Sequence, residues 1–352
     1  MDLSQLTFAY QPRYPEDYRP GIGIIGCGGI VRGGHLPAYQ KYGVNVVGVY
    51  DISPEAMAEV QKKFSVKHIF HSLDELLEHP EIAVVDIATH PAERVALIRQ
   101  ALAAGKHVLS QKPFAPDLAT AHALVQEAEE RGLRLAVNQN GRWSPAWRIA
   151  TLLVQQGVVG EVLAVTHMFE MNYSWITGTA FDTIPHVAIY DYAIHWIDIT
   201  RCWLEQKTVA SVRAREYRTP NQPVASKACW GMWAEFVYED GTSALLRGIN
   251  CTPTRQNGHP FWLHGSEGTI RGSTLGNDFL ELERAGVFIR YPLRGGWFPD
   301  GFAGTMGELL CAIAEEREPY NSARHNLLTL EMTLAACRSA KENVAAVALQ
   351  KL

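Results

Sequence analysis

The chain has 352 residues, of which 47% are hydrophobic and 20% are charged, and its formal net charge is −5. This length suggests two domains of ordinary size, and the composition is that of a soluble globular enzyme. The mild negative charge excludes a broad basic surface for nucleic acid, and no apolar run is long enough for a membrane-spanning helix.

The N-terminal extension, residues 1–20, is polar and lacks the apolar segment of a signal peptide. The six cysteines show neither a C-x-x-C pair nor the spacing of a zinc finger. We therefore expect reduced thiols and a cytoplasmic protein.

Short apolar segments alternate with helical patterns as far as residue 140. This alternation predicts an α/β domain of Rossmann type, with a doubly wound parallel sheet and right-handed connections. We assign residues 1–140 to this Rossmann-type domain. Strands are expected at 22–25, 46–50, 83–88, 107–110 and 133–137, and helices at 35–42, 54–64, 73–79, 93–104 and 118–131.

The first strand runs into a glycine-rich turn, and a helical pattern follows it. Glycine lets the backbone turn sharply and approach a pyrophosphate without a Cβ in the way. The next helix offers unpaired N–H groups and the positive end of its dipole to the phosphates. We expect the dinucleotide to be bound by Gly26, Gly28, Gly29, Ile30 and Val31, although Val31 stands where the strict fingerprint has a third glycine.

Asp51 ends the second strand, 25 positions after Gly26. A carboxylate in this place accepts hydrogen bonds from the adenosine ribose hydroxyls and repels a 2′-phosphate. Because no arginine follows at positions 52–54, we expect NAD rather than NADP. The alternative is a glycine turn in an α/β protein that binds no nucleotide.

The segment 110–113, Ser-Gln-Lys-Pro, follows another strand of this domain. Ligands of open α/β sheets bind at the carboxyl ends of the strands. Lys112 is therefore placed to donate a hydrogen bond to a substrate oxygen or to relay its proton. The alternative is a solvated surface lysine. The polar segment 138–142 follows the last strand, so Asn138 and Asn140 are candidates for contacts with the nicotinamide carboxamide and the substrate.

Beyond residue 140 the strands follow one another with few helices, which predicts an α+β domain over 141–352 with a large, mostly antiparallel open sheet. One face of such a sheet is free to pack on a second subunit, so we expect a homo-oligomer, a dimer or tetramer. Strands are expected at 162–170, 209–217, 232–238, 243–250, 261–265, 268–272, 279–283 and 287–291, and helices at 145–156, 187–203, 301–316 and 325–343.

The helix expected at 187–203 carries a second group of candidate residues. Spacings of three and four place Asp191, His195 and Asp198 on one helical face. A histidine beside a carboxylate can act as a general base, because the carboxylate stabilises its charged form. A buried structural histidine is one alternative, and a metal site that includes His186 is another, although we expect no metal.

Aromatic residues in loops are candidates for flanking a sugar ring. Trp143, Tyr173 and Trp175 lie in such segments, and we place them with Asn140, Asp191 and His195 among the substrate-binding residues. The other aromatic residues are expected in the core or at interfaces.

Together, the glycine turn, the Lys112-Pro113 strand end and the Asp191-x-x-x-His195 helix resemble the Gfo/Idh/MocA oxidoreductases over residues 20–345. The most specific parts are segment 105–109, which leads into Lys112-Pro113, and Asp191 with His195. The resemblance implies a Rossmann domain, a C-terminal domain with a large open sheet, and NAD(P) at their junction.

The resemblance also implies roles for individual residues. Lys112 corresponds to the catalytic lysine of the family's Glu-Lys-Pro motif, His195 takes the hydroxyl proton while hydride passes to nicotinamide C4, and Asp191 orients the substrate or His195. The chain departs from the family at Gln111, which replaces the motif glutamate, and at segment 89–94. There, His90 replaces a proline and Arg94 a later histidine. We expect Thr89, His90 and Gln111 to contact the cofactor.

The expected function is NAD-dependent transfer of hydride between a secondary alcohol of a sugar, glycoside or cyclitol and nicotinamide. Three alternatives stay open. The first is a glycoside-processing enzyme whose tightly bound NAD is recycled internally, by oxidation and elimination or by exchange between two substrates. The second is a non-catalytic nucleotide-binding subunit, and the third is a metal-dependent lyase or isomerase.

Overall fold

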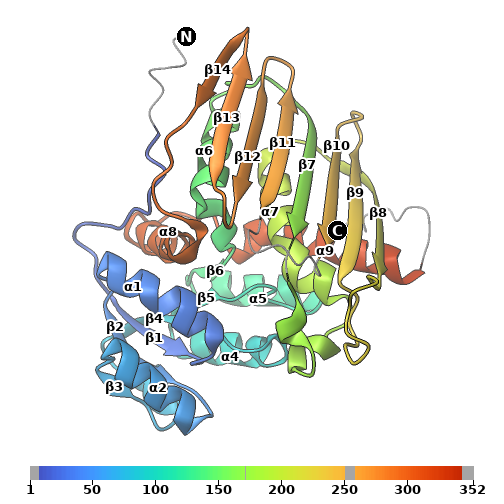
Figure 1. Ribbon diagram of the computed structural model, residues 1–352. Coiled ribbons are helices and arrows are strands. Elements are labelled where there is room, and N and C mark those ends of the chain that lie inside the picture. Colours follow the sequence, from blue (N-terminus) through green and yellow to red (C-terminus); the bar gives the residue numbers. More distant parts are fainter. Residues whose placement is uncertain (1–7, 171, 250–257, 343–352) are drawn as a thin grey trace. The chain divides into compact units, whose positions relative to one another are not determined.

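The computed structural model describes residues 8–170, 172–249 and 258–342, which form two compact units (Figure 1). The parallel-sheet unit contains Gln11–Trp143 and Trp297–Leu327. The mixed-sheet unit contains Ser144–Gly296, the chain up to Tyr10 and the chain from Leu328 onward. Several predicted positions lie outside the described residues: 1–7, 250 in the predicted strand 243–250, Cys251, and 343 in the predicted helix 325–343.

Six parallel strands form the sheet of the first unit, in the order β3-β2-β1-β4-β5-β6. This confirms the doubly wound parallel sheet expected from the alternating pattern. Strand β3 was absent from the prediction because two residues are too few to show a pattern. The strands are β1 Gly21–Ile25, β2 Val46–Tyr50, β3 His68–Ile69, β4 Ile82–Ile87, β5 His107–Ser110 and β6 Leu135–Val137.

Three helices of this unit begin at the predicted residues, 54, 73 and 118, whereas one begins at 91 rather than 93 and the first helical segment begins at 31 rather than 35. Ser53 accepts a hydrogen bond from the backbone N–H of Ala56 at the start of α2, and Asp117 accepts one from Thr120 at the start of α5. The helices are η2 Val31–His35, a π-helical turn that continues as α1 Leu36–Tyr42, then α2 Pro54–Phe64, α3 Leu73–Glu78, α4 Pro91–Ala103, α5 Leu118–Glu130 and the short η3 Asn140–Trp143.

A segment from late in the sequence belongs to the same unit. It contains η7 Trp297–Gly301, α8 Phe302–Ala314 and the first turn of α9 Ala323–Glu342. Phe302, Met306 and Leu309 are fully buried in one core cluster with residues of β1 and α1. The sequence pattern had assigned this helix to the domain 141–352, but its apolar face is covered by the parallel-sheet unit.

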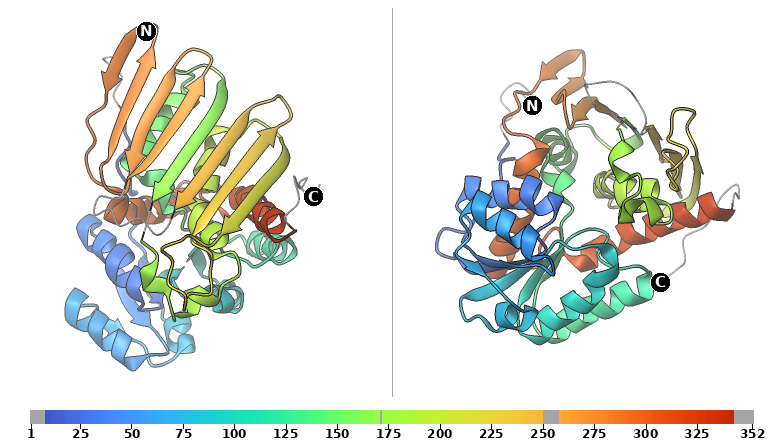
Figure 2. Two further views of the ribbon diagram at one scale, coloured as in Figure 1. Left: turned by 45° about the vertical axis from the view of Figure 1, so that its right-hand side comes forward. Right: turned by 60° about the horizontal axis from the view of Figure 1, so that its bottom comes forward.

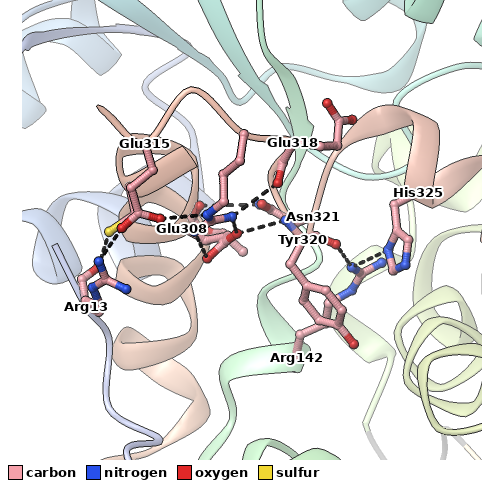
Figure 3. Close-up of polar contacts among 11 residues, drawn as sticks. Arg13, Arg142, Glu308, Glu315, Glu318, Tyr320, Asn321 and His325 are labelled. Carbon is pink, nitrogen blue, oxygen red and sulfur yellow. Dashed lines mark hydrogen bonds and ion pairs between the residues drawn. The ribbon is translucent and has the colours of Figure 1, made fainter. Parts of the chain in front are cut away.

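Polar contacts fix the loop after α8 to this unit (Figure 3). Glu315 forms an ion pair with Arg13, and the carbonyl of Tyr320 accepts a hydrogen bond from the buried Arg142. The same guanidinium nitrogen, Nη1 of Arg142, lies 3.1 Å from Nδ1 of the His325 ring. These contacts hold the C-terminal segment against the chain that follows β6.

Eight strands form the sheet of the second unit, in the order β14-β13-β12-β11-β7-β10-β9-β8. All neighbours are antiparallel except β7 and β10, so the prediction of a mostly antiparallel sheet is confirmed. The strands are β7 Val162–Glu170, β8 Val209–Tyr217, β9 Gly231–Tyr238, β10 Ser243–Ile249, β11 His259–Gly265, β12 Thr269–Thr274, β13 Phe279–Arg284 and β14 Val287–Arg290.

One face of this sheet is covered by helices α6 Pro145–Gln155 and α7 Ile194–Trp203. Short helical turns connect β7 to α7: η4 Ser174–Ile176, η5 Ala180–Thr183 and the π-helical turn η6 Ala188–Ala193. Figure 2 shows that no helix of the same unit lies over the opposite face of the described strands. That face carries partly exposed side chains, among them Thr166, Glu235, Leu245 and Trp262.

Candidate functional site

The glycine turn after β1 contains glycines of two kinds. Gly26 has a φ of +105°, and a Cβ on it would lie 2.7 Å from the carbonyl oxygen of Ala88. Gly26 is therefore needed for the close approach of two backbone segments. A Cβ on Gly28 or Gly29 would meet no atom within 4 Å. These two glycines border open space at the start of the η2–α1 helix, where a diphosphate fits.

Asp51 lies directly behind this turn. Its Oδ2 accepts a hydrogen bond of 2.6 Å from the backbone N–H of Cys27, and its Oδ1 accepts one of 2.8 Å from the N–H of Ser53. The carboxylate is thus fixed in position while part of it faces solvent. Burial, and to a lesser extent the nearby Asp51 charge, raises the pKa of the Cys27 thiol to about 12. Cys27 therefore stays a neutral thiol and is not a nucleophile.

A surface cavity of about 330 Å³ adjoins Asp51. Apolar side chains line much of it, and Ile52 beside it is 91% exposed. An open apolar cavity next to a carboxylate suits an adenine ring with its ribose. The lining residues are Tyr50, Asp51, Ile52, Pro54, Met57, Ala58, Gln61, Ile69 and His71.

Gln111 and Asn138, both expected at the cofactor, lie at the ends of neighbouring strands β5 and β6 and are joined by a buried histidine. The Gln111 side-chain nitrogen lies 2.7 Å from His35 Nε2, and that of Asn138 lies 3.2 Å from it. Sequence reasoning missed His35 and its partner Asp86. The signal for Asp86 was available, because a carboxylate in the apolar strand 82–87 has to find buried donors.

Arg94 explains the departure from the family pattern in segment 89–94. Its guanidinium is buried and donates to the carbonyls of Lys112 and Pro113 at 2.8 and 2.6 Å. It also donates to the Thr89 carbonyl at 2.7 Å. Arg94 therefore ties the loop after β4 to the loop after β5. His90 occupies the N-cap position of the helix α4 that carries Arg94, without a capping hydrogen bond from its side chain.

Asp191 and His195 lie one turn apart where η6 passes into α7, and both side chains are half-buried. Tyr192 lies between them in sequence, with its hydroxyl 3.1 Å from Nε2 of His259. Burial lowers the pKa of His259 to about 4, so its ring is neutral and accepts this bond. The buried ring of Tyr173 contacts Tyr192 edge to face. This packing fixes the turn that carries Asp191.

Asp198, predicted on one helical face with Asp191 and His195, is buried whereas those two residues are half-buried. The residue is 1% exposed, and its Oδ1 accepts a hydrogen bond of 2.7 Å from the Thr329 hydroxyl. Arg201 lies 3.8 Å from the same carboxylate oxygen. The physical reason is that α7 is covered on all sides after His195, where residues 196–204 are all buried.

The other candidate substrate residues differ in exposure. Trp175 is 53% exposed, whereas Tyr173 is buried. Asn140 and Trp143 belong to the parallel-sheet unit, where Asn140 accepts a bond of 2.6 Å from the Trp297 indole and Trp143 packs on Gly304. Lys112 also belongs to this unit, whereas Asp191 and His195 belong to the mixed-sheet unit.

Among the described residues, no group of three or more His, Cys, Asp or Glu side chains is arranged to hold a metal ion. His186, a possible ligand in the sequence, lies instead 2.6 Å from Glu216.

Over the residues that the structure describes, no helix combines the length and the apolar character needed to cross a bilayer.

Known proteins resemble this chain over nearly its whole length. It is 25% identical to a D-apiose dehydrogenase of Paraburkholderia graminis over 91% of this chain and 87% of that protein. It is 30% identical to a glucose-6-phosphate 3-dehydrogenase of Bacillus subtilis, over 55% of this chain and 57% of that protein. An oxidoreductase from Agrobacterium radiobacter, solved with NAD+, L-tartaric acid and magnesium, has the same fold: the TM-score is 0.83 at 21% identity, with 94% of this chain and 98% of that chain covered.

Two family models match most of the chain. Residues 21–139 match an oxidoreductase family with an NAD-binding Rossmann fold, and residues 147–271 match the GFO/IDH/MocA C-terminal domain. The glycine turn, Asp51 and Lys112 lie in the first match, and Asp191 and His195 lie in the second. The chain belongs to the Gfo/Idh/MocA family of NAD-binding oxidoreductases.

Proposed function

We propose that this protein is an NAD-dependent dehydrogenase that acts on a secondary alcohol of a sugar, glycoside or cyclitol. The observation that carries the proposal is the open glycine turn with the fixed Asp51 carboxylate behind it, in an NAD-binding Rossmann domain. The sugar dehydrogenases among the relatives support the substrate class.

The proposed preference for NAD over NADP rests on Asp51. Both carboxylate oxygens accept backbone N–H bonds, which fix the carboxylate in the position proposed for contact with the adenosine ribose. A 2′-phosphate in this place would meet a fixed negative charge, and residues 52–54 provide no basic side chain to offset it. Cofactor contacts are proposed for Gly26, Gly28, Gly29, Ile30, Val31, Asp51, Thr89, His90, Gln111, Lys112 and Asn138.

His195, Asp191 and Lys112 are proposed to carry the acid–base chemistry. His195 takes the proton of the substrate hydroxyl, and Asp191, one turn before it, stabilises the charge that the ring acquires. Lys112 donates a hydrogen bond to the same substrate oxygen and stabilises the charge developing there. Bound NAD would supply the redox chemistry, as the acceptor of the hydride.

The substrate is proposed to lie against Trp175, whose exposed indole offers an apolar face for a sugar ring. The buried Tyr173 ring holds Trp175 in position, because it packs against the rings of both Trp175 and Tyr192. Asn140 and Trp143 are proposed to shape the substrate side of the parallel-sheet unit.

The test is to follow the near-ultraviolet absorbance of reduced nicotinamide with NAD, NADP and a panel of sugars, cyclitols and glycosides. The protein is first checked for nicotinamide retained through purification. The expected result is formation of NADH with one substrate class. Consumption of a glycoside with tightly bound NAD and no net NADH would instead assign an internally recycled cofactor. Binding of NAD without conversion of any alcohol would assign a non-catalytic nucleotide-binding role.

We also propose that the uncovered face of the mixed sheet joins copies of the chain into a homo-oligomer. Trp262, Thr166, Leu245 and Glu235 form one row across four neighbouring strands of this face. Leu245 is 45% exposed in the middle of the row. Leu245→Glu should lower the mass measured by light scattering, whereas Val287→Glu on the outer strand β14 should not. An unchanged mass for Leu245→Glu would contradict this interface.

A cytoplasmic location is proposed as well. The five cysteines that the structure describes are free thiols, which is typical of a reducing compartment.

A further inference from the structure

The proposed reaction leaves one buried titratable pair without a role. His35 ends the π-helical turn that follows the glycine turn, and Asp86 lies on β4. Neither side chain is accessible to solvent. A buried polar pair of this kind is stable only when its donors and acceptors match, so the hydrogen bonds around the ring define where its protons lie.

The Nδ1 side of His35 faces a carboxylate. Nδ1 lies 2.6 Å from Asp86 Oδ2, and the Tyr39 hydroxyl donates to the same oxygen at 2.5 Å. Burial, with the Asp86 charge beside it, raises the pKa of Tyr39, so this hydroxyl keeps its proton. Since an ionised carboxylate only accepts hydrogen bonds, Nδ1 must carry a proton and donate a hydrogen bond to Asp86.

The Nε2 side of His35 faces two amide nitrogens, those of Gln111 and Asn138, at 2.7 and 3.2 Å. The far end of the Gln111 amide fixes its orientation, because Gln111 Oε1 accepts from the backbone N–H of Lys112 at 3.3 Å. Asn138 Oδ1 lies 2.8 Å from the Thr305 hydroxyl, whose single proton can also go to the Phe302 carbonyl at 2.9 Å, so the orientation of Gln111 carries the argument. An amide nitrogen is only a donor, so Nε2 is the acceptor and carries no proton. The ring is therefore the neutral Nδ1–H tautomer.

The Gln111 amide suits this tautomer, because its nitrogen can donate to the unprotonated Nε2. A glutamate at this position, as in the family motif, would place a second carboxylate against Nε2. Two acceptors cannot share a hydrogen bond without an added proton, and imidazole is more basic than a carboxyl group, so the ring would take up that proton and become an imidazolium between two carboxylates. The amide of Gln111 supplies the donor itself and leaves the ring neutral.

We propose that His35 is a positioning residue that, as a neutral Nδ1–H ring, fixes the side chain of Gln111 and through it the backbone of Lys112. The backbone of Lys112 is then held from two sides, its N–H by Gln111 and its carbonyl by Arg94. Only the catalytic importance of Lys112 rests on the proposed function. The tautomer and the contacts of His35 are independent of it.

The test is NMR spectroscopy of the full-length protein with ¹⁵N-labelled histidine, near neutral pH. The His35 signal is identified by its loss in His35→Gln. The wild-type ring should show the pattern of a neutral Nδ1–H tautomer. Gln111→Glu should add a second ring N–H and give the imidazolium pattern. The matched control is Gln100→Glu, the same chemical change on the exposed face of α4, which should leave the His35 signal unchanged.

Three results would overturn the proposal: an Nε2–H tautomer in the wild type, an imidazolium in the wild type, or a His35 signal that does not respond to Gln111→Glu. If His35→Gln does not fold, comparing Gln111→Glu with Gln100→Glu still identifies the signal, because Gln111 contacts the ring and Gln100 lies on the exposed face of α4. The spectrum requires no turnover. A neutral Nδ1–H ring in a protein that oxidises no alcohol would refute the proposed function alone, whereas turnover with the wrong tautomer would refute the role of His35 alone.

Discussion

The two units hold their candidate residues in place by different interactions. In the parallel-sheet unit, hydrogen bonds join the ends of neighbouring strands, and His35 and Arg94 connect the residues expected at the cofactor. In the mixed-sheet unit, a π-helical turn and contacts between aromatic rings position Asp191 and His195. The hydrogen bonds of the parallel-sheet unit fix the charge and orientation of the groups that they join, whereas the aromatic contacts of the mixed-sheet unit fix the shape of the turn that they surround. Substitutions in the two units should therefore reduce activity or stability in different ways.

The largest effect is expected from removing the proposed acid–base groups. Lys112→Ala and His195→Ala should each lower kcat about 10²–10⁴-fold, because a positioned acid or base contributes that much. NAD affinity, measured by titration calorimetry, should change little in His195→Ala. Lys67→Ala removes an exposed lysine of the parallel-sheet unit and should retain wild-type turnover. Near-wild-type rates in both site variants, with the fold intact, would remove these residues from the mechanism.

Gly26→Ala should cost the parallel-sheet unit about 3 kcal/mol of unfolding free energy, because its φ is +105° and the new Cβ would meet the Ala88 carbonyl. The control is Gly132→Ala, which also has a positive φ but would place its Cβ in open space; it should cost about 1 kcal/mol. Urea denaturation measures both. Equal costs would mean that the close approach of the two backbone segments is unimportant.

Asp51→Ala should shift cofactor preference toward NADP, because it removes the fixed charge that opposes a 2′-phosphate. The ratio of kcat/KM for NAD to that for NADP should fall about 10–100-fold, which corresponds to about 1.4–2.7 kcal/mol. Asp74→Ala, at an exposed position of α3, should leave the ratio unchanged. A constant ratio in Asp51→Ala would show that another residue selects the cofactor.

The mixed-sheet unit should lose stability in mild acid. Burial lowers the pKa of His167 to about 3 and that of His259 to about 4, both from 6.5. Between these values and pH 6.5 the unfolded chain binds protons that the folded chain does not, so stability is complete above about pH 6.5 and falls as the pH decreases.

Each of these histidines contributes up to about 1.4 kcal/mol per pH unit to this loss. His259→Gln should reduce the slope of unfolding free energy against pH, and His264→Gln, at an exposed position of β11, should not. Chemical denaturation at several pH values measures the slope. Equal slopes in the wild type and His259→Gln would contradict a buried neutral His259.

The sequence predicted those features that depend on nearby residues. The strand, glycine turn and helix around Gly26, and the acid at Asp51, lie within one βαβ unit, so their spacing carries the information. The strands of the mixed sheet were also predictable, because alternating burial leaves a periodic pattern in each. The pairing of Asp191 with His195 rests on helical spacing and on the family resemblance.

The remaining features depend on contacts between distant parts of the chain. His35 is 76 residues from Gln111, and no local pattern indicates that they meet. The burial of Asp198 depends on Thr329, 131 residues away. The association of α8 with the parallel sheet is another such feature. Helical periodicity shows that α8 has an apolar face, but it does not show which of the two units that face packs against.

The central proposal is that Lys112 and His195 act as acid–base groups on the substrate alcohol while its hydride passes to NAD. The most direct measurement is a single-turnover experiment, in which enzyme saturated with NAD is mixed with an active alcohol and reduced nicotinamide is followed by absorbance. The account predicts a burst of NADH equal to the enzyme in the wild type, and a burst slowed at least about 10²-fold in both Lys112→Ala and His195→Ala. A burst of wild-type rate in either variant, with NAD bound, would contradict it.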